Sequence, residues 1–190
     1  MYILGDIGNS ETKIYLVSSN NVIIKNISLP TNKINNKNLK LKFKSLTKSF
    51  FGIEKVLFCS VVPKSFKQIK KFLSNKTKKK CYEVKDLKLK SLIKINVIFK
   101  QVGSDRLTNA ISLSNNKDNF IILDFGTATT FDVIIKKTYK GGIIAPGIKI
   151  SLNTLSDKAT LIPQINLKKI KKVLGNDTVS AVRSGFFWGY

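Results

Sequence analysis

The sequence predicts an α/β protein built from two similarly folded halves, each with a mixed β-sheet flanked by helices. Two patterns support this class. Short apolar runs bounded by turn residues alternate with segments in which apolar residues recur at helical spacing. One strand–turn–strand pattern also occurs twice, as expected of two related halves. The 190 residues are 43% apolar, which is enough for a hydrophobic core.

The first half is predicted to begin with a strand hairpin and to continue through alternating helices and strands. Strands are expected at 2–8, 12–17, 22–27, 56–62 and 92–97, with a turn at Asn20 and Asn21. Helices are expected at 33–50 and 64–73, where apolar residues recur every three or four positions.

The second half is predicted to begin near Gly103, which divides the chain into 1–103 and 104–190. Its expected elements are a helix at 106–113, a buried strand at 120–125, a strand at 129–135, a glycine-rich loop at 141–147, a helix through Leu155 and a last helix at 178–190.

The net charge of +23 comes from 34 basic and 11 acidic residues. Only Arg106 and Arg183 are arginines, and the lysines are spread along the chain without interleaved aromatic residues. A nucleic-acid interface would gather such residues on one patch, so nucleic-acid binding is not expected as the main function. A basic surface would still attract an anionic substrate such as a nucleotide.

Several classes of protein are excluded by what the sequence lacks. It has no histidine, so histidine bases, serine–histidine nucleophiles and most zinc sites are not expected. Cys59 lies in an apolar run and is expected to be a small core residue. No apolar run spans a bilayer and no secretory signal is recognisable, so a cytoplasmic protein without a membrane contact is expected.

The repeated pattern consists of an apolar strand, Asp-x-Gly, small polar residues and a second strand. It occurs first at Asp6 and Gly8 and again at Asp124 and Gly126. Glycine lets backbone N–H groups approach a phosphate closely, while an aspartate can hold a cation that bridges to the phosphates. A single copy would be an ordinary turn more often than a site, but two copies favour a phosphate site.

The polar residues of the two turns would add hydrogen bonds to the phosphates. The candidate phosphate-binding residues are Asp6, Gly8, Asn9, Ser10, Thr12, Lys13, Gly126 and Thr127. Lys13 could reach a terminal phosphate as a point charge. Asp132 also lies on a predicted strand, where a hydrogen-bonded structural role is an alternative.

The segment from Gly103 to Arg106 is a third candidate feature. The plain interpretation is a helix start capped by Ser104 or Asp105. The rare arginine argues for more, because its planar fork grips carboxylates and phosphates. With no histidine in the chain, Asp105 is the candidate general base and Arg106 the candidate substrate anchor.

The glycine-rich loop at 141–147 could admit adenine or phosphate, or could be only a tight connection. The chain has neither the P-loop motif nor the dinucleotide-binding glycine motif, so those two nucleotide-binding folds are not expected.

Together these motifs resemble type III pantothenate kinases, a family of the actin and acetate kinase superfamily. The resemblance rests on the residues 6–13, 102–107, 123–132, 141–163 and 175–178, and on Ser184 and Gly185. It implies two ribonuclease H-like (actin-like ATPase) halves and the ATP-dependent phosphorylation of pantothenate, the first step towards coenzyme A. ATP and Mg²⁺ would be required, and a monovalent cation, K⁺ or NH₄⁺, would bind near Asp124.

The resemblance also implies roles for single residues. Asp105 would accept the proton, and pantothenate would be held by Gly103, Ser104, Asp105, Arg106 and Thr178 in a homodimer. Two departures stand out. The tyrosine that touches pantothenate in many relatives would fall near Asn96, where none is close. Relatives also usually continue with more helix beyond the position of Tyr190, so two interpretations stay open: a short version of the family, or a chain truncated in its second half.

Two alternatives remain open on the sequence alone. One is another kinase or phosphatase of the superfamily, such as a sugar kinase, an acetate kinase or an exopolyphosphatase. The other is a non-catalytic relative that acts as a regulator or binds nucleic acid. Retention of Asp6, Asp105 and Asp124 argues against the second alternative.

Overall fold

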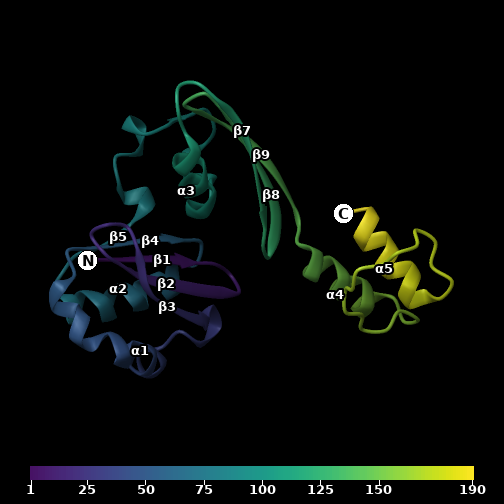
Figure 1. The fold of residues 1–190 in the computed structure, drawn as a ribbon, viewed down its shortest axis with the longest axis horizontal. Helices are drawn as coiled ribbons and strands as arrows, with labels where there is room; N and C mark the ends of the chain where they lie inside the picture. The colour runs from purple at the N-terminus through teal and green to yellow at the C-terminus, as the bar shows by residue number, and fades with distance from the viewer. The chain divides into compact units, whose positions relative to one another are not determined.

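A computed structural model describes the backbone of residues 1–190 and all side chains except those of residues 45 and 47–49. It confirms the mixed α/β class, with one five-stranded and one four-stranded sheet and helices beside them (Figure 1). The chain divides into two compact units. The first comprises residues 1–120 and 133–141, and the second comprises residues 121–132 and 142–190.

The first unit contains a five-stranded sheet with the strand order β3-β2-β1-β4-β5. Its strands are β1 (Tyr2–Ile7), β2 (Glu11–Val17), β3 (Ile23–Pro30), β4 (Lys55–Ser60) and β5 (Cys81–Glu83). β1 pairs with β2 in antiparallel and with β4 in parallel orientation. The predicted turn after β2 is confirmed, and Asn21 takes a positive φ of 60° there.

Two helices cover the core face of this sheet, α1 (Asn36–Phe43) and α2 (Pro63–Thr77). Alternate residues of the strands, such as Ile3, Ile7 and Phe58, are buried on that face and pack with Ile69 and Leu73 of α2. Burial of these apolar side chains is the main stabilising term of the unit. The opposite face carries α3 (Ser104–Leu113), whose start lies beside β4.

The four-stranded sheet has the order β6-β9-β8-β7. Its strands are β6 (Lys94–Ile95), β7 (Asn119–Phe125), β8 (Ala128–Ile135) and β9 (Thr138–Pro146). β6 pairs in parallel with the part of β9 that belongs to the first unit. The second unit continues with α4 (Ile148–Lys158) and α5 (Thr178–Trp188).

Three expectations about elements were wrong. The helix predicted over 33–50 is an α-helix only over Asn36–Phe43 and continues as a 3-10 helix over Lys44–Gly52. Gly141 and Gly142 lie inside β9 rather than in a loop. β7 was expected to be buried, but it is exposed on one face, which carries Ile121, Leu123 and Phe125, and is only partly buried on the other.

Within the described part of the chain, none of the helices combines the length and the apolar character needed to span a bilayer.

Candidate functional site

The first Asp-x-Gly turn lies at the end of β1, on the sheet face opposite the core. Asp6 is paired in register with Lys13 on β2 and with Cys59 on β4. Residues directly opposite each other on neighbouring strands point to the same face. The carboxylate, the ammonium and the thiol therefore share one face, while Ile3 and Ile7 point into the core.

The turn between β1 and β2 is closed by its own hydrogen bonds. The Gly8 N–H donates to the Glu11 carbonyl oxygen at 3.0 Å. Below it, the Thr12 and Thr31 hydroxyls share a hydrogen bond of 2.9 Å, and the Thr31 hydroxyl donates to the Gly8 carbonyl oxygen at 2.7 Å. Thr12 is completely buried, and its hydroxyl stabilises the turn through Thr31 from the interior.

The tip of the same turn presents polar groups to the outside. Asn9 and Ser10 are exposed, as is Lys13 just beyond them. The Lys13 ammonium lies 3.7 Å from the Glu11 carboxylate, and both side chains are about half exposed. An exposed pair of this kind is weak, so it leaves Lys13 available to an anion that binds at the turn.

Cys59 connects the first turn to the start of α3. Its thiol donates to Asp6 Oδ1 at 3.4 Å. Burial raises the pKa of Cys59 far above its usual range, and the nearby carboxylates of Asp6 and Asp105 raise it further, while a hydrogen bond with Thr108 acts the other way. Asp6 therefore contacts a neutral thiol, and α3, which carries Asp105, packs against β4, the strand that carries this thiol. The expectation that Cys59 is a core residue was wrong, because it is only partly buried and faces the candidate site.

The start of α3 carries the third motif. The helix begins at Ser104 with Gly103 as its N-cap residue, so neither Ser104 nor Asp105 occupies the capping position. Asp105 lies in the first turn, where its Oδ1 accepts the Arg106 N–H at 2.8 Å.

Residue 103 must be glycine for the Asp105 carboxylate to occupy its position. A Cβ atom on residue 103 would fall on Asp105 Oδ1, while its contact with Val61 would be an ordinary one at 3.5 Å. The glycine therefore leaves the space into which the Asp105 side chain turns.

A pocket of about 380 Å³ lies beside this motif in the first unit. It is lined by residues from β4, α2, β5 and the segment that leads into α3, including Glu83, Lys85, Lys100, Gly103 and Ser104. Glu83 and Lys85 were not singled out on the sequence. The only available signal was the scarcity of acids, since Glu83 is one of 11 in the chain.

The second Asp-x-Gly turn has the same place at the end of a strand as the first, but it is one residue shorter. Asp124 lies one residue before the end of β7, as Asp6 does in β1. The Gly126 N–H donates to the Ala128 carbonyl oxygen at 2.9 Å, which closes the turn into β8. The predicted repeat of one strand–turn–strand unit is therefore confirmed.

The glycine-rich segment meets this second turn. The Gly147 N–H donates to the Thr127 carbonyl oxygen at 3.0 Å. A Cβ atom on residue 147 would collide with the backbone of Gly126 and Thr127, so only glycine permits this approach. The start of α4 is thereby fixed against the turn.

The second unit also contains buried hydroxyls without a described partner. The Oγ1 atoms of Thr129 and Thr130 have no hydrogen bond among the described residues. Thr129 lines a pocket of about 390 Å³ together with Gly126 and the first turn of α4. An unsatisfied buried hydroxyl costs about 1–3 kcal/mol, so a bound molecule or water that accepts its hydrogen bond would be stabilised there.

The remaining predicted residues of the second unit lie in different settings. Asp132 is completely buried on β8. Thr178 is exposed and is the first residue of α5, next to Asp177, whose carboxylate accepts the Ser180 N–H at 2.9 Å and caps the helix. That hydrogen bond lowers the pKa of Asp177.

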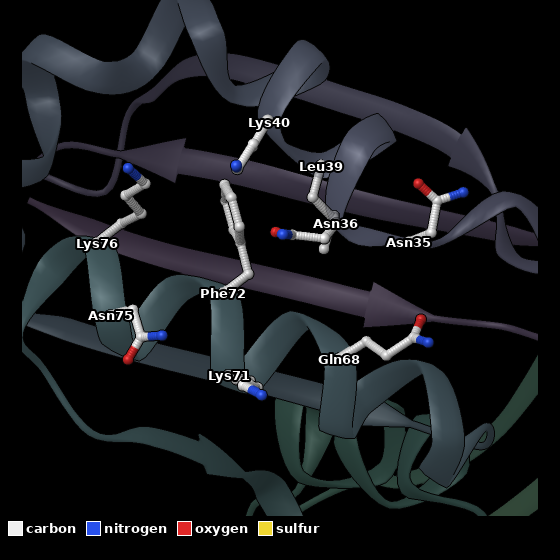
Figure 2. A pocket seen from close by; sticks show the side chains of 9 residues that line it. All are labelled: Asn35, Asn36, Leu39, Lys40, Gln68, Lys71, Phe72, Asn75 and Lys76. Atoms are coloured by element: carbon white, nitrogen blue, oxygen red, sulfur yellow. The ribbon is translucent and has the colours of Figure 1, made fainter.

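A groove between α1 and α2 lies apart from these motifs (Figure 2). It has a volume of about 440 Å³, and Leu39 and Phe72 lie in it among amide and lysine side chains. It contains none of the predicted site residues and is not part of the candidate site.

The described residues include no group of three or more Cys, Asp or Glu side chains that could hold a metal ion by themselves. Each Asp-x-Gly turn instead offers a single carboxylate, Asp6 in the first unit and Asp124 in the second. Mg²⁺ in kinases is usually held by one or two carboxylates together with substrate phosphates and water, so one such carboxylate fits a nucleotide-bound Mg²⁺.

Comparison of the sequence with protein families gives a match over residues 2–190 to the family described as type III pantothenate kinase. A type III pantothenate kinase of Pelagibacter ubique (strain HTCC1062) is 62% identical over 190 residues, which cover all of this chain and 77% of that protein. The enzyme of the same name from Syntrophotalea carbinolica is 35% identical over 75% of this chain and 56% of its own length. That from Maricaulis maris is 50% identical over 46% of this chain and 35% of its own length.

Two solved structures have similar folds. A protein described as a Baf family transcriptional activator from Campylobacter jejuni matches with a TM-score of 0.54 and 21% identity, over 98% of this chain and 74% of that one. A protein described as a 2-dehydro-3-deoxygalactonokinase from Sinorhizobium meliloti matches with a TM-score of 0.51 and 8% identity, over 85% of this chain and 58% of that one. At such identities the likeness concerns the fold alone, and it supports the predicted ribonuclease H-like class.

Proposed function

Because the chain belongs to the type III pantothenate kinase family, we propose that it transfers the γ-phosphoryl group of ATP to the hydroxyl group of pantothenate, the first step of coenzyme A biosynthesis. Pantothenate and ATP are then its substrates, and the cytoplasm, where both are available, is its place of action.

The observation that carries the residue assignments is that β4 lies beside both motifs: its Cys59 thiol contacts Asp6, and it packs against α3, which carries Asp105. One carboxylate belongs to a turn suited to phosphates, and the other begins a helix next to a pocket. A phosphoryl-transfer site needs both functions close together, because the nucleophile must be deprotonated where the γ-phosphate is held.

In the proposed reaction Asp105 is the general base. Its carboxylate accepts the proton of the pantothenate hydroxyl as that oxygen forms a bond to the γ-phosphorus, and the bond from phosphorus to the bridging oxygen of ADP breaks. Gly103, Ser104 and Arg106 hold the substrate beside the base, with the Arg106 guanidinium as a bidentate donor to an anionic group. Ser104 can contribute only through its backbone, because its buried hydroxyl donates to Glu83.

The two turns hold the phosphates of ATP. Asn9, Ser10 and Lys13 donate to them from the first turn, which Gly8 and Thr12 keep closed. Gly126 and Thr127 belong to the second turn. Most of the rate enhancement comes from this positioning and from electrostatic stabilisation of the transferred group.

Asp6 and Asp124 would hold the cations, Mg²⁺ bound to the nucleotide and a monovalent ion, K⁺ or NH₄⁺, near Asp124. When bound, these ions offset the negative charge of the phosphates. The chain would act as a homodimer, with Thr178 contributing to the pantothenate site.

The test is an ADP-release assay with pantothenate, with a panel of sugars and acetate, and with no acceptor. Release that depends on pantothenate, on Mg²⁺ and on K⁺ rather than Na⁺ is expected. ADP release with a sugar or acetate, or phosphate release from polyphosphate, would instead indicate another enzyme of the superfamily. Salt-sensitive DNA binding without any kinase activity would indicate a regulator.

The first predicted variant is Asp105→Asn, which keeps the shape of the side chain and removes the base. We expect kcat to fall by about 10²–10⁴-fold, the usual contribution of a general base, with ATP binding almost unchanged. Stopped-flow turnover and calorimetric titration with an ATP analogue measure the two quantities. Turnover close to that of the unmodified protein would exclude Asp105 as the base.

A further inference from the structure

We propose that Lys85 and Glu83 are positioning residues for the proposed reaction, because they fix the segment that carries Asp105 from both sides. The inference rests on the proposed function for the role of Asp105. The contacts themselves belong entirely to the first unit.

Lys85 holds the segment that precedes α3. It lies in the 3-10 turn Val84–Asp86 that follows β5. Its ammonium donates to the carbonyl oxygens of Val102 at 2.7 Å and Lys100 at 3.1 Å. It also lies 5.4 Å from the ring centroid of Phe99. One cation therefore binds three of the residues that lead into Gly103, and hydrogen bonds from a charged donor are stronger than neutral ones.

Glu83 holds the first residue of α3. One carboxylate oxygen accepts a hydrogen bond from the Ser104 hydroxyl. The other accepts the Lys85 N–H at 2.7 Å. Ser104 is only 2% exposed, so its hydroxyl has little access to water and the hydrogen bond to Glu83 fixes its direction. The helix start is thereby tied to the same turn that carries Lys85.

These contacts fix the residues on both sides of Gly103, directly before the proposed base. Lys85 binds the carbonyl oxygen of Val102, Glu83 binds the side chain of Ser104, and Asp105 follows directly. The Asp105 carboxylate must also fit the space above Gly103. A shift of the segment by about 1 Å would misplace the base, and misplacement of this size can cost about 10²-fold in rate.

The main test compares Lys85→Met with Asp105→Asn and with the double variant. Lys85→Met keeps the length of the side chain but removes the donors. We expect kcat to fall by about 10–100-fold, with the KM for ATP changed by less than about twofold. In the Asp105→Asn background the same substitution should cause no further fall, because it acts through the base.

Conservative variants and a matched control complete the test. Lys85→Arg retains a charged donor and should recover part of the activity. Glu83→Gln keeps an acceptor for the Ser104 hydroxyl and should retain more activity than Glu83→Ala. Lys88→Met, at an exposed lysine three residues further along, should leave kcat unchanged.

A second measurement does not depend on activity. The Leu107 N–H donates to the Gly103 carbonyl oxygen at 3.1 Å in the first turn of α3. Amide hydrogen exchange of Leu107, the first amide bonded within α3, should be faster in Lys85→Met than in Lys88→Met.

The inference is overturned if Lys85→Met has normal kcat, or if it lowers the residual activity of Asp105→Asn by the same factor as that of the unmodified protein. Unchanged exchange in α3 would show that the contacts do not hold the helix start. Absence of pantothenate-dependent ADP release in the unmodified protein would refute the proposed function, while the exchange result would still decide whether Lys85 holds the segment.

Discussion

A substitution at Gly103 should displace the carboxylate of the candidate base while the backbone keeps its conformation. Its φ of −61° and ψ of 145° are accessible to alanine. A Cβ atom at this position would meet only the Asp105 carboxylate at close range. The side chain of Asp105 can rotate away, so the fold should tolerate the change while the carboxylate leaves its present position.

We therefore expect Gly103→Ala to lower kcat by about tenfold or more while the free energy of unfolding changes by less than about 1 kcal/mol. Steady-state kinetics and urea unfolding measure the two effects. A normal kcat would mean that the present position of the Asp105 carboxylate is not the active one. Loss of folding would mean that the backbone, rather than the side chain, has to move.

For single residues, motifs that are continuous in the sequence could be predicted, whereas contacts that depend on the register between strands could not. The Asp-x-Gly repeat and the segment from Gly103 to Asp105 are continuous in the sequence, so composition and spacing identify them. The contact between Cys59 and Asp6 joins residues 53 positions apart. It depends on the pairing of β1 with β4, which an apolar run does not specify.

Helices and strands followed the sequence where the period of apolar residues was unambiguous. α2 is an example, since Ile69, Phe72 and Leu73 form its buried stripe. In α1 the period of apolar residues is ambiguous, because Leu41 lies two positions from Leu39 and points to the opposite side of the helix. Leu41 is 70% exposed and Leu39 is completely buried. The spacing of apolar residues also does not predict that the α-helix continues as a 3-10 helix after Phe43.

This contrast between buried and exposed leucines gives a prediction for the first unit. Leu73→Ala removes a completely buried side chain from α2 and should lower the free energy of unfolding by about 2–5 kcal/mol. Leu41→Ala is the control and should change it by less than about 0.5 kcal/mol. Urea unfolding followed by circular dichroism measures both. Equal effects of the two substitutions would contradict the placement of α2 in the core.

For the whole molecule, the sequence predicted two related halves, and the strand–turn–strand arrangement of both Asp-x-Gly segments is consistent with that relationship. The boundary at residue 103 remains a prediction. The compact units are not continuous in sequence, because β7, β8 and β9 each contribute residues to both. Such a division depends on how strands pair over long separations, which local patterns do not encode.

The charge of the whole chain affects its stability and its affinity for ATP in opposite directions. The net charge is +23. With 34 basic and only 11 acidic residues, the acidic groups can pair directly with no more than a minority of the cations. Most of the cations are therefore not neutralised by direct partners, and their mutual repulsion opposes the compact state. The same positive field attracts the phosphates of ATP.

We expect the melting temperature to rise by about 2 °C or more when NaCl is increased from about 10 mM to about 150 mM, because the Debye length falls from about 30 Å to about 8 Å. Over the same range the Kd for ATP should increase, since screening also weakens the attraction of the anion. Choline chloride at equal ionic strength should act like NaCl if screening is the cause. A melting temperature that falls with salt, or responds only to Na⁺, would show that repulsion among the lysines does not limit the stability of this chain.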